Sequence, residues 1–223
     1  MQSKVISSEK DWLDLRMKVI TATEGACLLG LNKYSSANQM WKNKQENNFT
    51  GNAYTLVGQV LEPAVVDITN RILNKDFRLY EEEYRGKVFF YDAALGVGAT
   101  PDAFEQNILL ECKTTRPFSF LRYRGVPPSH YIMQVQIQML CTGAEEGYLS
   151  ILSTDLTQST DNIKWPIVIY KIHKSEKLLE MFLKELERFW TCVKDKKMFR
   201  VDSKIKAKAR LLLPLVCEEV SYK

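Results

Sequence analysis

The stretch that decides the fold is residues 100–113, TPDAFEQNILLECK, in which a charged pair closes an apolar segment. Side chains two apart in a strand share a face, so Glu111 and Lys113 point one way and Cys112 points the other. The short segment that follows Asp102 favours a hairpin connection to this strand, which places Asp102 beside Glu111. The stretch therefore predicts two carboxylates and a lysine that converge on a β-hairpin.

Converging carboxylates repel each other, and burying them is costly unless a cation neutralises them. Oxygen ligands favour Mg²⁺, for which Mn²⁺ can substitute. Such an ion polarises a phosphoryl oxygen and activates water, and an adjacent lysine can orient that water. An exposed cross-strand ion pair is the alternative for an isolated Glu-x-Lys. Leu109 and Leu110 indicate a buried strand instead, which favours a phosphodiester hydrolysis site.

Around this stretch, the periodicity predicts helices on both sides of a central group of strands. Ser8 is a candidate N-cap, Thr21 and Thr23 offer caps for a second helix, and Pro63 should kink a long helix or restart it near Glu62. Polar loops are expected at 47–52 and 153–164. Helices are expected at about 8–19, 21–30, 36–45, 54–73, 130–141 and 175–193, and strands at 77–84, 87–91, 96–99, 108–113, 148–152 and 165–172.

The first four of these strands suggest an antiparallel meander. A mixed sheet covered by helices on both faces is the simplest packing, so the expected class is α/β or mixed α+β. At 223 residues, with 45% hydrophobic and 26% charged residues, the chain suits a single domain over residues 1–223.

Composition also excludes several classes of protein. Apolar runs fall far short of a bilayer span and the first residues lack a secretory pattern, so a cytoplasmic protein without membrane contact is expected, in the host cell if the gene belongs to a phage. The five cysteines are scattered and form no Cys-x-x-Cys pair. This argues against a disulfide framework, a zinc site and an iron–sulfur cluster.

The net charge of +4 is modest, but basic residues concentrate near the C-terminal end. Segment 194–210 carries eight lysines and arginines against two aspartates. Such an excess can neutralise DNA phosphates, or it can be a solvated helix face.

The helix expected at 130–141 is largely apolar, yet it carries a polar seam. Tyr131, Gln134 and Gln138 fall on one face at positions i, i+3 and i+7. A polar seam on a buried helix must meet partners, either in an active site or as satisfied core amides.

Taken together, these motifs resemble the PD-(D/E)XK nuclease superfamily, and within it the lambda exonuclease or YqaJ-like viral recombinase family. The resemblance covers residues 12–136 and says little about the C-terminal third. Its blocks stand in the family's order: Trp12-x-x-x-Arg16, Val19-Ile20-Thr21-Ala22-Thr23-Glu24, Gly58-x-x-x-Glu62, Thr100-Pro101-Asp102, Leu110-Glu111-Cys112-Lys113 and Tyr131-x-x-Gln134-Val135-Gln136.

The resemblance implies a role for each matching residue. It implies that the metal is bound by Asp102, Glu111 and the backbone carbonyl of Cys112, with Glu62 supporting the metal or its water. It further implies that Lys113 assists the nucleophilic water and that Gln134, one turn from Tyr131, contributes to the active site.

The resemblance also implies a pocket for a 5′-terminal phosphate, with Arg16 and Thr23 at the matching places, and it adds Thr100 as a further substrate-binding residue. Thr23 and Thr100 stand where the family often has serine, which keeps the hydroxyl but adds a methyl group. A guanidinium can bind phosphate through two hydrogen bonds, and Thr23 is expected to open a helix whose N–H groups favour an anion. The alternative is an Arg16 paired with Asp14 or Glu24, beside a Thr23 that only caps.

We therefore expect a magnesium-dependent deoxyribonuclease that degrades double-stranded DNA from an end. The resemblance implies 5′ to 3′ polarity, a ring-shaped homotrimer and cooperation with a single-strand annealing protein in phage-type homologous recombination. The alternatives are a PD-(D/E)XK endonuclease, restriction-like or RecB-like, and a DNA-binding protein without catalysis.

Overall fold

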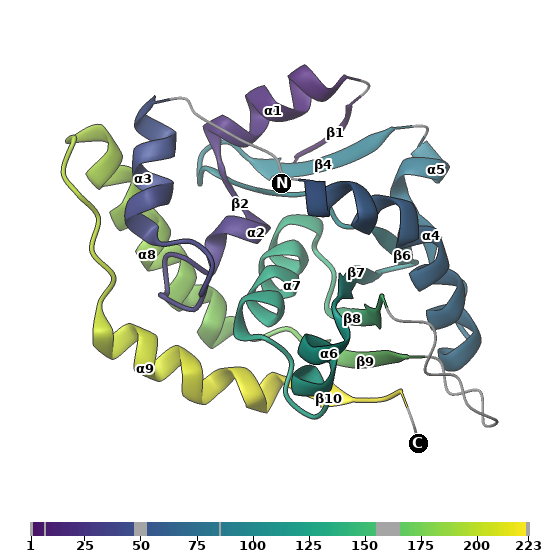
Figure 1. The fold of residues 1–223 in the computed structure, drawn as a ribbon. Coiled ribbons are helices and arrows are strands. Elements are labelled where there is room, and N and C mark those ends of the chain that lie inside the picture. Colours follow the sequence, from purple (N-terminus) through teal and green to yellow (C-terminus); the bar gives the residue numbers. More distant parts are fainter. Residues whose placement is uncertain (1, 7, 47–52, 85, 155–165, 222–223) are drawn as a thin grey trace.

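The computed structural model describes residues 2–6, 8–46, 53–84, 86–154 and 166–221 (Figure 1). Its helices are α1 (Glu9–Lys18), α2 (Ala22–Gly25), α3 (Ala37–Glu46), α4 (Ala53–Leu73), α5 (Tyr80–Tyr84), α6 (Pro117–Tyr123), α7 (Ser129–Thr142), α8 (Glu176–Lys194) and α9 (Ser203–Leu212). Its strands are β1 (Gln2–Ile6), β2 (Ile20–Thr21), β3 (Arg78–Leu79), β4 (Lys87–Asp92), β5 (Val97–Ala99), β6 (Ala103–Glu105), β7 (Ile108–Thr115), β8 (Glu146–Ser153), β9 (Ile167–His173) and β10 (Cys217–Glu219).

In the described part of the chain, the strands form two mixed sheets. The larger sheet has the order β10-β9-β8-β7-β6-β3, with β7 parallel to β8 and the other pairs antiparallel. The smaller sheet has the order β1-β4-β5-β2, in which only β2 and β5 are parallel. The expected mixed α/β class is confirmed. The expected meander is wrong, because its strands are divided between the two sheets.

Helices cover the two faces of the larger sheet (Figure 1). Leu109 packs with α7 and α8, whereas its neighbour Leu110 packs with Val65 and Ile68 of α4. Both leucines are almost fully buried, as expected for a central strand covered on both sides. Strand β7 therefore lies in the middle of the hydrophobic core, and any charge on it must find partners inside the protein.

Two expected elements differ from the structure. The strand expected at 77–84 is only β3, followed by the short helix α5, whose run of three glutamates suits a helix N-terminus better than a sheet. The helix expected at 21–30 ends at Gly25, and tight turns then lead to Gly30, which has a φ of +64°. A positive φ ends helical geometry, and glycine adopts it without steric cost.

Other expectations are confirmed or fall outside the described residues. Ser8 caps α1 by accepting a hydrogen bond from the N–H of Asp11. Helix α4 continues through the exposed Pro63, so a fresh start near Glu62 is wrong. The loop at 47–52 and nearly all of the loop at 153–164 lie outside the described residues. Within the described residues, no helix combines the length and apolar character needed to span a membrane.

The turn between β4 and β5 yields a stability prediction. Gly96 has a φ of +67°, and an added Cβ would lie 2.4 Å from Nε1 of Trp190. We expect Gly96→Ala to lower the free energy of unfolding by about 2–4 kcal/mol, from the left-handed backbone and from overpacking. Urea unfolding measures this change.

Gly143 provides the matched control. Its φ is +81°, and an added Cβ would meet nothing within 4 Å. Gly143→Ala should therefore cost only about 1–2 kcal/mol, from the backbone alone. Equal costs at the two positions would contradict a tight contact between Gly96 and Trp190.

Candidate active site

The predicted hairpin is formed by β6 and β7. Ala103 pairs with Leu110, which places Asp102, one residue earlier, opposite Glu111. The Asp102 carboxylate accepts a hydrogen bond of 2.7 Å from the backbone N–H of Cys112. The expected proximity of the two acids is therefore confirmed, and the backbone of β7 fixes the orientation of Asp102.

Glu111 is a buried carboxylate with three side-chain donors. Its exposed fraction is 1%. It accepts hydrogen bonds from the Nζ of Lys113 and from the amide groups of Gln134 and Gln138 on α7. One ion pair and two amide bonds compensate for the loss of water around this charge.

Gln138 belongs to this group although it was not among the predicted site residues. The motif blocks end at Gln136, but the polar seam with Tyr131 and Gln134 pointed to it. Gln138 is fully buried, and its Oε1 has no hydrogen-bond partner among the described residues. The amide NH₂ groups of Gln134 and Gln138 both donate to Glu111, so the partner that the polar seam meets is the candidate active-site carboxylate.

Tyr131 and Lys113 face each other across the same site. The Lys113 Nζ lies 5.5 Å from the centre of the Tyr131 ring, within cation–π range. Burial alone would lower the pKa of Lys113, but Glu111 and Asp102 raise it above its usual value. The lysine is therefore held as a cation.

The third acid, Glu62, is contributed by α4. Burial, and next the charge of Glu111, raise the pKa of Glu62 to about 7. Burial, Glu111 and Glu62 likewise raise the pKa of Asp102 well above its usual value. The three acids are close enough to oppose one another's ionisation, which is the arrangement that a bound cation relieves.

The donor chemistry of these acids fits Mg²⁺, which prefers oxygen ligands. Among the described residues, no three His, Cys, Asp or Glu side chains are gathered closely enough to hold a metal by themselves. Mg²⁺ does not need such a cage, because it keeps several waters and is held by one or two carboxylates together with substrate phosphate. Asp102 and Glu111 suffice for that mode.

Arg16, Trp12 and Thr100 form a chain of contacts beside this hairpin. The guanidinium of Arg16 lies 4.4 Å from the centre of the Trp12 ring. The indole N–H of Trp12 donates to the hydroxyl of Thr100 at 3.3 Å, two residues before Asp102. Burial lowers the pKa of Arg16, and the charge of Glu24 opposes that shift.

The structure corrects the expectation for Thr23. Thr21 precedes the first residue of α2, whereas Thr23 lies exposed within this four-residue helix. The Glu24 carboxylate accepts hydrogen bonds from the N–H and the hydroxyl of Thr21, at 2.9 and 3.0 Å. A carboxylate of the chain itself therefore lies at the helix N-terminus, and the expectation that Thr23 opens the helix is wrong. A contact between Thr23 and a phosphate stays a prediction.

Lys44 is a buried cation that the sequence did not reveal. Its side chain is 3% exposed and forms an ion pair of 3.1 Å with Glu24. Its Nζ also donates to the backbone carbonyls of Arg16 and Val19, both at 2.8 Å. Lysines recur along α3 without an apolar pattern that would single this one out. Lys44 fixes the end of α1, from which Arg16 projects.

The basic segment 194–210 comprises the end of α8, a connection and most of α9. Figure 1 shows α9 running below α8, on the side of the molecule away from α4 and α5. Lys204, Lys208 and Arg210 are exposed on this helix, whereas Lys206 is half-buried. Whether the segment contacts DNA stays a prediction.

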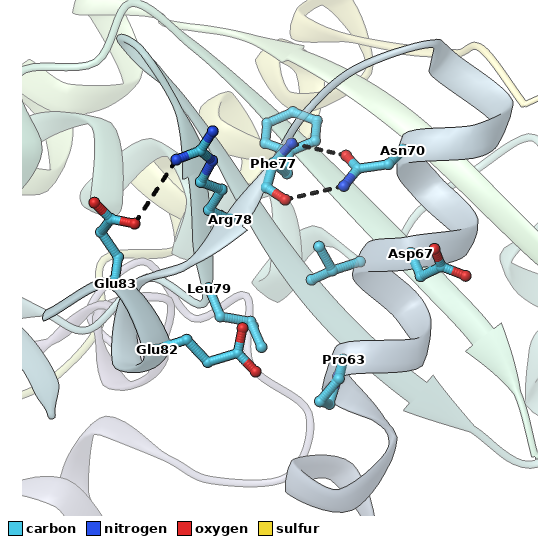
Figure 2. A pocket seen from close by; sticks show the side chains of 9 residues that line it. Pro63, Asp67, Asn70, Phe77, Arg78, Leu79, Glu82 and Glu83 are labelled. Atoms are coloured by element: carbon cyan, nitrogen blue, oxygen red, sulfur yellow. Dashed lines mark hydrogen bonds and ion pairs between the residues drawn. The ribbon is translucent and has the colours of Figure 1, made fainter. Parts of the chain in front are cut away.

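A cavity of about 350 Å³ lies between α4, β3 and α5 (Figure 2). Three acids, Asp67, Glu82 and Glu83, line it against one arginine, Arg78. This excess of negative charge disfavours the binding of a phosphate, so the cavity does not suit the ligand expected at the site on β7.

The sequence matches a known domain family. The model of the YqaJ-like viral recombinase domain matches residues 11–145. The uncharacterized protein YqaJ of Bacillus subtilis is 24% identical over 194 residues, 82% of this chain and 56% of that protein. The chain thus spans little more than half the length of this relative.

Solved structures share the fold. The alkaline exonuclease LHK-Exo of Laribacter hongkongensis matches with a TM-score of 0.67 at 19% identity, over 93% of this chain and all of that one. A phage related exonuclease of Haemophilus somnus matches with a TM-score of 0.56 at 15% identity, over 83% of this chain and 97% of that one. The family model covers more than half of the chain and the fold agrees with it, so this protein belongs to the YqaJ-like viral recombinase family.

Proposed function

We propose that this protein is a magnesium-dependent exonuclease that hydrolyses phosphodiester bonds of double-stranded DNA from an end. The observation that carries the proposal is the buried Glu111 carboxylate, held by Lys113, Gln134 and Gln138 beside Asp102. A buried charge at a core position lowers the stability of the fold. Its presence there therefore indicates a function for the charge.

Asp102 and Glu111, with the backbone carbonyl of Cys112, would hold the ion, and Glu62 would support its water. When bound, Mg²⁺ supplies charge to neutralise the phosphate and a water of lowered pKa. The pairing of oxygen donors with a substrate phosphate matches the way Mg²⁺ is usually bound.

The protein's own residues position the reacting groups. Lys113 is held as a cation and can orient the attacking water or stabilise charge that develops on the phosphate. Gln134 and Gln138 fix both oxygens of Glu111, which keeps this carboxylate in one orientation. Tyr131 covers Lys113 on the side facing α7 and limits its access to water.

The similar structures support the exonuclease activity in this proposal. Two are described as exonucleases, and one LHK-Exo structure, with a TM-score of 0.66 at 20% identity, contains dAMP. We further propose 5′ to 3′ polarity, a homotrimer and a single-strand annealing partner, as the family resemblance implies. A PD-(D/E)XK endonuclease is the alternative activity, and a DNA-binding protein without catalysis is the alternative class.

Incubation with linear, nicked and covalently closed circular DNA in the presence of Mg²⁺ separates these functions. An exonuclease degrades the linear duplex and spares the closed circle. Cleavage of the closed circle would establish an endonuclease, and intact DNA in every sample would establish a binding protein. Omission of Mg²⁺, with EDTA added, should abolish cleavage.

Substitutions that remove one charge from the cluster test the catalytic assignment. We expect Glu111→Gln and Lys113→Gln to reduce the cleavage rate by about 10²–10³-fold, the usual loss when a charge-stabilising group is removed. Both should retain DNA binding measured in EDTA.

Asp102→Asn should raise the Mg²⁺ concentration needed for half-maximal activity, and an unchanged metal titration would exclude Asp102 as a ligand.

Glu105→Ala is the control for this series. Glu105 lies on the same hairpin, but its partners are Lys75 and the N–H of Asp76, away from the cluster. Its substitution should leave the cleavage rate of the folded protein near that of the wild type. Wild-type activity in Glu111→Gln or Lys113→Gln would remove that residue from the catalytic set.

End recognition gives a separate prediction. We propose that Arg16 holds the 5′-terminal phosphate, so a duplex with 5′-phosphate ends should be degraded faster than one with 5′-hydroxyl ends. Arg16→Ala should remove most of this difference, and Arg16→Lys should restore only part of it, since an ammonium cannot form the two-pronged contact. Lys18→Ala, an exposed change on the same helix, should retain the full preference. An undiminished preference in Arg16→Ala would place the phosphate elsewhere.

A further inference from the structure

A group of aromatic side chains adjoins the catalytic lysine, and apart from Tyr131 its members have no role in the function proposed above. Tyr131, which lies over Lys113, contacts His130 and Tyr123, with ring centres at 4.3 and 6.4 Å. His130 in turn meets Tyr34 edge to face, at 5.4 Å. The rings form a continuous path from the buried lysine to Tyr34.

Tyr34 stands at the outer end of this path. It is 71% exposed, whereas Tyr123 and His130 are 7% and 8% exposed. Exposure of a whole aromatic ring is unfavourable in water, and such rings are common where a protein binds a ligand.

The position of Tyr34 is nevertheless fixed. The side chain of Asn32 accepts hydrogen bonds from the N–H groups of Tyr34 and Ser35, at 2.8 and 3.3 Å. The hydroxyl of Tyr34 lies 3.5 Å from that of Tyr123. These contacts hold the ring at its edge and leave much of its surface in solvent. A ligand that stacks on it would encounter a ring that is already ordered.

The charges around the path favour a nucleotide. Lys33 is exposed, and its Nζ lies 5.2 and 5.6 Å from the ring centres of Tyr34 and Tyr123. Burial, and next the charges of Lys33 and Lys113, lower the pKa of His130 to about 4, so this ring is neutral at physiological pH. Aromatic faces beside an exposed cation suit a base that is attached to a phosphate.

We propose that Tyr34 is a stacking site for an unpaired base of the DNA strand that is cleaved. In a duplex both faces of a base are covered by its neighbours, so only an unpaired base can stack on a protein ring. The ring path leads from Tyr34 to Lys113, so a strand that stacks on Tyr34 lies beside the cleavage site. This inference rests on the proposed nuclease function for the identity of the strand, but not for the stacking itself.

Phe118 offers a matched control. It is 67% exposed on α6, and the guanidinium of Arg122 lies 4.2 Å from its ring centre. It therefore presents the same pair of groups, an exposed ring and a cation. No ring contact among the described residues links it to Lys113.

The test uses 2-aminopurine, a fluorescent base that is quenched when it stacks. The probe is a DNA duplex with a single-stranded 5′ extension, in which one extension position at a time carries 2-aminopurine. EDTA prevents cleavage, so binding and quenching are read without catalysis. Wild type, Tyr34→Ala, Tyr34→Phe, Tyr34→Leu and Phe118→Ala are compared at the same salt concentration.

In the wild type we expect quenching at one or two extension positions. Tyr34→Ala should lose most of it and bind the extension about tenfold more weakly, near the lower end of the range for one base on one ring. Tyr34→Phe, which keeps the ring, should retain the quenching, and so should Phe118→Ala. Tyr34→Leu keeps an apolar side chain without a ring, so it should also lose most of the quenching. It takes the place of Tyr34→Ala in the comparison if the alanine variant does not fold.

Three results would overturn the proposal. They are an absence of quenching in the wild type, quenching that survives in Tyr34→Leu, and an equal loss in Phe118→Ala. Loss of binding to a protein partner with unchanged quenching would assign the exposed ring to a protein interface.

The outcome is independent of the nuclease assay. Quenching that depends on Tyr34, in a protein that cleaves no DNA, would retain the stacking site and reject the nuclease. Cleavage of DNA by the wild type, together with unchanged quenching in Tyr34→Leu, would retain the nuclease and reject the stacking site.

Discussion

The fold is organised around a carboxylate that is buried at the centre of a sheet. Glu111 is 1% exposed on β7, so its charge must be met inside the protein. The strand supplies one donor, Lys113, and α7 supplies the amides of Gln134 and Gln138. A helix with these amides can pack only in one register against β7, because a shift of one residue would leave a charge or an amide without a partner. The polar seam thus fixes how α7 sits on the sheet.

The same cluster lowers the stability of the fold. Burial and mutual repulsion raise the pKa of Glu62 to about 7 and that of Asp102 well above its usual value, because the folded state disfavours three negative charges in one place. Lys113 offsets part of this repulsion. A structural ion pair would need only one acid for one lysine, and the proposed Mg²⁺ would relieve the repulsion that remains among the three acids.

The hairpin, α7 and its polar seam could be predicted because each follows from a local pattern: alternation in β7, turn residues after Asp102, and helical spacing in α7. Contacts between distant segments carry no such pattern. Gln138 and Lys44 gain their roles only from packing against β7 and against the end of α1, which join residues 27 and 28 apart. The smaller sheet also includes β1 at its edge, a mostly exposed strand without an apolar core pattern that would have predicted it. Thr23 does not cap α2, because Thr21 precedes the helix and its N–H and hydroxyl donate to the Glu24 carboxylate.

The proposed end-binding and cleavage sites share one rigid path. Arg16 lies against Trp12, Trp12 donates to Thr100, and Thr100 precedes Asp102 by two residues. Lys44 holds the carbonyl of Arg16 from the other side, and its burial leaves it little freedom to move. An enzyme that cuts at a fixed distance from a strand end needs these two sites at constant separation. Packed side chains maintain such a separation better than a loop, because the close-packed interior resists deformation. In the proposed enzyme, the buried Lys44 of α3 would contribute by holding the end of α1, and with it the backbone of Arg16, in place.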